Sequence, residues 1–157
     1  MATHSIGFAQ RRIEPLALQQ RANGFNLKVT VKYSDINDSS LTTDGDLVAV
    51  KLFTTPAHWA IAKVMAVVRT AFTTDGTLTV KVGTASDDDM QIAAASVKTA
   101  GAISPAAGLV PAAASLGNTA ADIIATFATQ ASTGAPADIS AGEVDFYFEV
   151  IDADALD

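Results

Sequence analysis

Residues 60–83 read AIAKVMAVVRTAFTTDGTLTVKVG, and this stretch decides the fold class. Residues 78–82 alternate apolar and polar side chains, which is the period-two pattern of a half-buried strand. The run before them alternates in a similar way, and the adjacent pair Val67 and Val68 adds the β-branched character that strands favour. Thr-Asp-Gly at 74–76 is a turn signal between the two runs. The sequence therefore predicts a β-hairpin at the centre of an all-β domain.

The first run, residues 60–72, also fits a helix. Its larger apolar side chains recur at helical spacing, and Thr55-Pro56 ahead of it resembles an N-cap followed by a first-turn proline. The adjacent valines and the turn that ends the run favour the strand. We therefore predict a strand here, with the helix as the alternative.

Further strands are predicted on both sides of this stretch. Residues 25–33 and 142–151 alternate cleanly between apolar and polar side chains, and residues 47–53 form a third such run. Residues 119–130 fit either a strand or a short helix, and the strand is preferred. Residues 91–114 are rich in Ala, Ser and Gly and contain two prolines, so we expect short edge strands and loops there.

Charge spacing suggests how the first and last of these strands pair. Lys28 and Lys32 are four residues apart, and so are Asp145 and Glu149. Antiparallel pairing would place Lys28 opposite Glu149 and Lys32 opposite Asp145, with the apolar residues of both strands on the buried face. This register is a hypothesis about one pair of strands.

Length and alternation predict a single β-sandwich domain over residues 25–157, preceded by an extended N-terminal arm or docked segment at residues 1–24. The chain has 157 residues, enough to bury a substantial core. Residues 1–24 lack sustained alternation, so they are expected to form either a short docked helix or an arm that orders on a neighbour. The chain contains no cysteine, which excludes disulfides and thiolate metal sites.

The charge is unevenly distributed along the chain. It has 10 basic and 17 acidic residues and a net charge of −7, and most of the acidic side chains follow residue 70. The basic residues are spread along predicted strands instead of forming a patch, so we expect no nucleic-acid partner. No apolar run approaches the roughly 20 residues that span a bilayer, and the N-terminus lacks a signal-peptide pattern, so we expect no membrane partner.

Catalytic motifs are missing from the sequence, and we predict that the chain is not an enzyme. His4 and His58 are the two side chains that could act as bases at neutral pH, and each is interpreted as structural. The sequence has no Gly-x-Ser-x-Gly elbow and no phosphate-binding glycine loop. We therefore predict no catalytic residue and no cofactor.

Two acidic loops invite a calcium interpretation. Asp35-x-Asn37-x-Ser39 with Asp46 imitates EF-hand spacing, but Ser40 stands where that loop requires glycine. The second loop, at residues 87–89, is interpreted as solvated surface, and no metal site is predicted. An aromatic platform for a sugar could be formed by Phe53, Trp59 and Phe72, but core packing is the preferred use of these rings.

A series of segments has a recognisable order. It comprises a proline turn at Pro56, VMAVVRTAF at 64–72, TTDG at 73–76, TLTVKVGTASDDDM at 77–90, AAASVKTAGAI at 93–103 and GEVDFYFEVI at 142–151. Within it lies a V-G-T-x-x-D step that begins at Val82. This series resembles small head proteins of tailed bacteriophages, of the decoration or cement type.

The resemblance implies a virion structural protein on the outer surface of the capsid. Such a β-sandwich or jelly-roll binds the assembled major capsid protein lattice, stabilises the head and often acts as a homo-oligomer. The family has no catalytic motif, so the resemblance assigns no catalytic residue to this chain. In this chain Phe8, Arg11 and Arg12 are the candidates for lattice contact, because the N-terminal segment is basic. The alternative is a receptor- or carbohydrate-binding module of a phage fibre or a bacterial surface protein, which should expose an aromatic cluster or a polar pocket.

Overall fold

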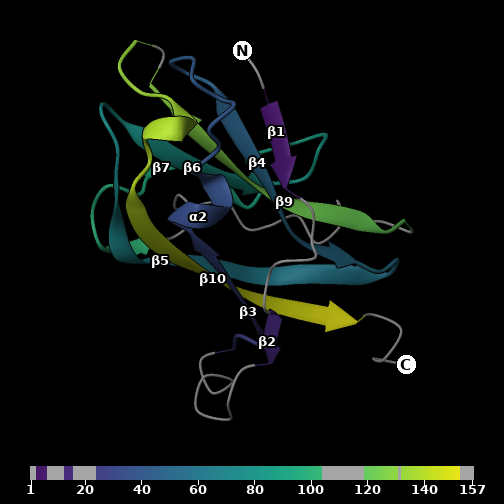
Figure 1. Cartoon of the computed structure of the whole chain (residues 1–157). Helices are drawn as coiled ribbons and strands as arrows, with labels where there is room; N and C mark the ends of the chain where they lie inside the picture. Colours follow the sequence, from purple (N-terminus) through teal and green to yellow (C-terminus); the bar gives the residue numbers. More distant parts are fainter. Residues whose placement is uncertain (1–2, 7–12, 16–23, 104–118, 131, 153–157) are drawn as a thin grey trace.

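The computed structural model describes residues 3–6, 13–15, 24–103, 119–130 and 132–152, which form two facing five-stranded sheets (Figure 1). Sheet A contains, in spatial order, β1 (Thr3–Ile6), β4 (Leu47–Thr55), β9 (Ala121–Thr129), β6 (Leu78–Gly83) and β7 (Ile92–Ser96). Sheet B contains β2 (Ile13–Pro15), β3 (Leu27–Lys32), β10 (Ala141–Asp152), β5 (Trp59–Thr73) and β8 (Gly101–Ile103). Between strands lie the helical turns α2 (Tyr33–Ile36) and η3 (Pro136–Asp138), and no helix in the described ranges could cross a membrane.

The strand pairs of β3 to β10 are nested. β3 pairs with β10, β4 with β9, β5 with β8, and β6 with β7, all antiparallel. Such pairing arises when one long antiparallel ribbon, with its tip between β6 and β7, is rolled so that successive segments join alternate sheets. This arrangement is a jelly roll. The predicted all-β fold is therefore confirmed.

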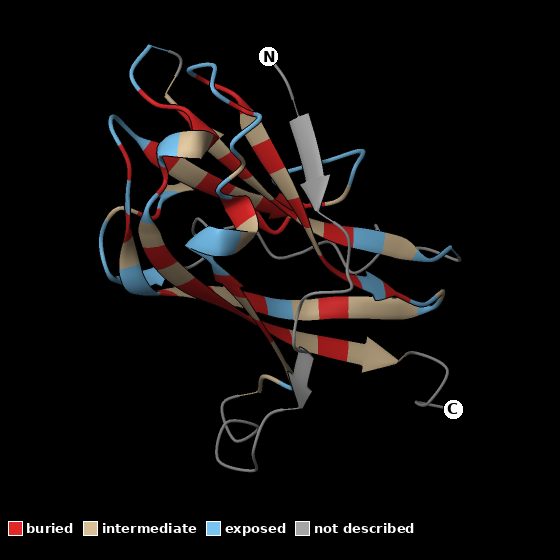
Figure 2. Ribbon diagram, in the orientation of Figure 1, coloured by how far each residue is buried: buried red, intermediate tan, exposed pale blue. Residues whose placement is uncertain are grey.

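The core lies between the two sheets and is filled by the inward-facing residues of both, which appear as alternating red bands along the strands (Figure 2). Two aromatic pairs join the sheets across it. Phe53 of β4 meets Phe148 of β10 edge-on with ring centroids 4.9 Å apart, and Phe72 of β5 lies 5.9 Å from Phe127 of β9. These contacts fix the separation of the layers, because interior rings pack as tightly as the rest of the core.

The predicted central hairpin is wrong, although both of its strands exist. β5 belongs to sheet B and β6 to sheet A, so the turn at residues 74–76 crosses from one layer to the other. Lys98 holds this crossing by donating hydrogen bonds to the carbonyl oxygens of Thr74 (2.6 Å) and Gly76 (2.5 Å). Turn residues mark a change of direction in either case, and they do not specify which strand pairs with which.

The predicted pairing of the first and last strands is confirmed, but the register is wrong by two residues. Lys28 lies opposite Tyr147, and Lys32 lies opposite Glu143. A shift of two keeps the same residues on the buried face, so the alternation could not distinguish the two registers. Tyr33, expected to point inward with this strand, is 41% exposed because the chain enters α2 there.

Other predictions agree with the structure where it describes the chain. Residues 60–72 form strand and not helix, and so do residues 121–129. The Ala-rich stretch supplies β7 and β8, which are edge strands. The N-terminal segment includes β1, parallel to β4, and β2, antiparallel to β3, neither of which the sequence pattern revealed.

Candidate functional site

The outer face of sheet B carries a compact polar cluster at its centre. β10 lies between β3 and β5, and its odd-numbered residues up to Glu149 point away from the core. Five side chains from these three strands interact there. We call them the outer-face cluster: Lys28 and Thr30 of β3, Arg69 of β5, and Asp145 and Tyr147 of β10.

Asp145 is the centre of this cluster and is only 2% exposed. Its carboxylate accepts hydrogen bonds from Thr30 Oγ1 at 2.6 Å and Arg69 Nε at 2.7 Å. Lys28 Nζ lies 3.1 Å away, and the Tyr147 hydroxyl donates at 3.2 Å. Burial acts to raise the pKa of Asp145, but the bonds from Thr30, Arg69 and Lys28 outweigh it and hold the pKa below its ordinary value.

Arg69 is held by the cluster and still faces solvent. Its Nε donates to Asp145, and a terminal nitrogen donates to the hydroxyl of Tyr147. The side chain remains 48% exposed, and the other N–H groups of the guanidinium have no partner among the described residues. The hydrogen bond to Asp145 outweighs partial burial and raises the pKa of Arg69 above its ordinary value, so the side chain is charged at all working pH values.

Tyr147 forms the floor of the cluster. Its side chain is 6% exposed although it lies on the outer face. Lys28 Nζ is 6.0 Å and Arg69 Cζ 5.9 Å from the ring centroid, and the ring of Phe25 is 6.0 Å away. The two cations therefore lie within cation–π range of an apolar surface, which restricts where their charged groups can move.

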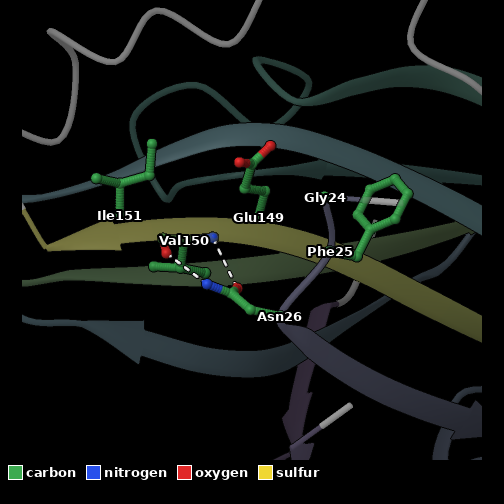
Figure 3. Close-up of a pocket in the computed structure, with 6 residues that line it drawn as sticks. All are labelled: Gly24, Phe25, Asn26, Glu149, Val150 and Ile151. Carbon is green, nitrogen blue, oxygen red and sulfur yellow. Dashed lines mark hydrogen bonds between the residues drawn. The ribbon is translucent and has the colours of Figure 1, made fainter. Parts of the chain in front are cut away.

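A shallow groove of about 410 Å³ adjoins the cluster next to the start of β3. It is lined by Gly24, Phe25, Asn26, Glu149, Val150 and Ile151 (Figure 3). The amide of Asn26 donates to the Val150 carbonyl at 2.7 Å and accepts from the Val150 N–H at 2.9 Å, as Figure 3 shows. The Asn26 side chain therefore continues the hydrogen bonding along β10 past Phe148, where pairing with β3 begins at Leu27.

The Phe25 ring connects the groove to the cluster. Lys63 Nζ lies 5.4 Å from the centroid of Phe25 and 3.7 Å from a carboxylate oxygen of Glu149. Gly24, with a φ of +83°, passes so close that a Cβ there would lie 2.7 Å from Lys63 Nζ. The groove is therefore lined by an aromatic ring and by Glu149, whose carboxylate pairs with Lys63.

Among the side chains that the structure describes, the outer face of sheet B has a small positive excess, in a chain whose net charge is −7. Its cations are Lys28, Lys32, Lys63 and Arg69, and its carboxylates are Glu143, Asp145 and Glu149. Asp145 is buried beneath its partners, so it contributes little negative charge to the exposed surface.

A second groove, of about 430 Å³, lies at one end of sheet A. Its acidic residue, Asp122, accepts from Thr54 Oγ1 at 2.7 Å and pairs with Lys51 Nζ at 2.8 Å. These hydrogen bonds, the one from Lys51 first, lower the pKa of Asp122. The pair is largely exposed, and such pairs add little stability or specificity.

The residues predicted to contact a lattice, Phe8, Arg11 and Arg12, lie outside the described residues. His58 is exposed in the turn between β4 and β5 and has a φ of +66°. The aromatic platform suggested by the sequence is not formed. Phe53 and Phe72 are buried in the core against different rings, and Trp59 packs against that core.

In the loop with EF-hand-like spacing, which begins at Asp35, two acidic side chains accept local hydrogen bonds. Asp35 accepts from the backbone N–H of Lys32, and Asp38 accepts from both the N–H and the hydroxyl of Ser40. Asn37 donates to two backbone carbonyls near η3. Over the ranges that the structure describes, no three His, Cys, Asp or Glu side chains come together as a metal site.

The fold and this surface define a class: a jelly-roll β-sandwich with a polar cluster around Asp145 on the outer face of one sheet. Comparisons of the chain with protein-family models, with curated proteins and with solved structures found no match. The functional interpretation therefore depends on the outer face of sheet B. Sequence patterns indicated that Lys28 and Asp145 face outward, but not that Arg69 and Tyr147 join them.

Proposed function

We propose that the chain is a virion structural protein of a tailed bacteriophage, a decoration protein that binds the assembled major capsid protein lattice from outside. The observation that carries the proposal is the outer-face cluster, which holds the half-exposed side chain of Arg69 on the outer face of sheet B. Such a face suits contact with a large surface, whereas small ligands are usually enclosed. The segments that resemble phage decoration proteins support the same function.

The composition of this face is that of a protein interface. Arg and Met are enriched at such interfaces, and the face contains the exposed Arg69 and the half-buried Met65. Val67, beside Arg69 on β5, adds a half-buried apolar side chain. These side chains stand on β5, which is paired with β10 along its length, so little backbone ordering is needed when a partner binds.

On a symmetric shell, contacts that are individually weak are sufficient for stable binding of many copies. Copies that associate on the lattice raise one another's effective concentration, so we propose that the chain acts there as a homo-oligomer. Binding to the assembled shell, and not to free subunits, stabilises the head by mass action. The proposal assigns the chain a binding role and no catalytic step.

Cosedimentation tests the proposal. Empty heads of the phage that encodes the chain, prepared without this protein, are mixed with increasing amounts of purified chain. We expect saturable binding at a fixed number of copies per head and a higher disruption temperature of the heads. Binding that never saturates, or heads that are no more stable, would refute the proposal.

The groove beside Phe25 favours a second candidate, a carbohydrate-binding module. Its volume of about 410 Å³ is in the range of small-ligand sites, and its lining includes the ring of Phe25 and the carboxylate of Glu149. A glycan array separates the two functions. Binding to defined glycans that is lost in Phe25→Ala, together with no binding to heads, would establish the alternative.

A further inference from the structure

We infer that Arg69 is a pre-organised anchor for a carboxylate side chain of the partner protein, with Lys28 as a second cation beside it. The inference rests on the proposed function and specifies which surface makes the contact and what chemistry it recognises. It places the contact on β5 and β3 of sheet B, and not on the N-terminal Arg11 and Arg12.

The guanidinium of Arg69 is already fixed before any partner binds. Asp145 and Tyr147 each accept a hydrogen bond from it, while its remaining N–H groups make no hydrogen bond to another described residue and the side chain is 48% exposed. An arginine fork of this kind matches the two oxygens of a carboxylate. Because the side chain is ordered in advance, binding loses less conformational entropy.

Charge also favours an anionic group at this position. The cluster contains two cations, Lys28 and Arg69, against one carboxylate, and that carboxylate is 2% exposed beneath them. An approaching anion therefore meets a positive surface. The acidic character of the chain as a whole, with a net charge of −7, opposes a polyanion such as nucleic acid, which would also face the acidic surroundings.

The surroundings of Arg69 indicate a protein partner. Met65 and Val67, its neighbours on the outer face of β5, are half-buried apolar side chains. A protein surface can cover these two side chains and so exclude water from an ion pair at Arg69, which strengthens the pair. A free anion would leave them exposed.

Three variants and one control test the inference on the intact chain, with the empty heads as the probe. Arg69→Ala should weaken binding to heads by about 30-fold or more, as central arginines of interfaces do. Arg69→Lys keeps the charge but not the fork, and should weaken binding by roughly tenfold. Val67→Glu places a negative charge beside the site and should also weaken binding. The control is Lys81→Ala, an exposed cation of β6 paired with Asp88, which should leave binding within about twofold.

Carbodiimide cross-linking identifies the partner group. The amine introduced by Arg69→Lys should couple to an Asp or Glu of the major capsid protein, and peptide mass spectrometry should locate the bond. Coupling only to Asp145 or to a second copy of this chain would overturn the inference. Complete loss of the binding of the chain to heads when inorganic phosphate alone is added would overturn it as well.

These experiments distinguish failure of the proposed function from failure of the inference about Arg69. If the wild-type chain does not bind heads, the proposed function is wrong and the inference fails with it. If it binds and the Arg69 and Val67 variants bind equally well, only the inference is overturned. Thermal unfolding of each variant shows whether it is folded, and Val67→Glu, which removes no hydrogen bond of the cluster, keeps the test valid if Arg69→Ala is unstable.

Discussion

Replacing Asp145 by Asn should destabilise the chain by about 2 kcal/mol at pH 7. The substitution removes the negative charge between Lys28 and Arg69, each of which lies within 3.1 Å of a carboxylate oxygen. A hydrogen bond to a charged group contributes roughly 1.5–3 kcal/mol, and two are lost. Lys28 is 23% and Arg69 48% exposed, so water compensates part of that loss and the net effect falls to about 2 kcal/mol.

The effect depends on pH with a defined sign. The pKa of Asp145 is lower in the folded chain than in the unfolded chain, because the bonds from Thr30, Arg69 and Lys28 outweigh burial. Its contribution to stability is therefore complete above the unfolded pKa of about 3.9 and is lost as the pH falls through the lower, folded value. The difference between wild type and Asp145→Asn should accordingly shrink below about pH 4.

Urea unfolding followed by the fluorescence of Trp59, the single tryptophan, measures both quantities. Asp122→Asn is the matched control, since Asp122 also has a lowered pKa but is 44% exposed on sheet A. We expect the control to lose less than about 1 kcal/mol. Equal stabilities of wild type and Asp145→Asn at pH 7, or a difference that does not change down to pH 3, would refute the role given to the cluster.

Three further substitutions test the fold. Gly142→Ala should cost about 3 kcal/mol, because Gly142 has a φ of +136° and a Cβ there would lie 2.2 Å from the ring of Phe72; the melting temperature reports this loss. Phe148→Ala should cost about 3–5 kcal/mol in urea unfolding, since it leaves a cavity beside Phe53 at the centre of the core. Asn26→Ala should cost about 1 kcal/mol and speed hydrogen exchange at the β10 edge, because two hydrogen bonds to that strand are lost.

Gly101 provides the control for the glycine variant. It also has a positive φ, of +144°, but no atom of the described residues lies within 4 Å of the position of its Cβ. Gly101→Ala therefore measures the backbone strain without the clash, and it should be the milder of the two. Equal losses at both positions would show that the contact with Phe72 is not the cause.

The sequence predicted the layers of the fold better than their connections. Alternation depends only on which face a residue occupies, so it identified the inner residues of β3, β5, β6 and β10. It contains no information about which strand lies alongside. A ribbon rolled across two sheets and a simple hairpin give the same alternation and the same Thr-Asp-Gly turn, and the hairpin prediction was wrong for that reason.

The cluster was predictable only in part. Sequence spacing correctly placed Lys28 and Asp145 on the outer faces of paired strands, yet it assumed that charged residues lie directly opposite each other. In the structure Lys28 lies opposite Tyr147 and reaches Asp145 diagonally. The contribution of Arg69 depends on β5 lying on the other side of β10, which is a property of the topology and not of local sequence.

Asp145→Asn also separates two explanations of binding to heads. If the surface attracts its partner by net charge alone, removing a negative charge beside Lys28 and Arg69 should strengthen binding. If Arg69 acts because Asp145 and Tyr147 hold it, the variant must order this side chain on binding, at a cost of roughly 0.5–1.5 kcal/mol. Our inference therefore requires weaker binding, by about two- to tenfold, measured as the dissociation constant from empty heads at two salt concentrations. If this less stable variant instead binds heads more tightly, the positive charge of the face determines binding. Pre-organisation of Arg69 is then not the cause.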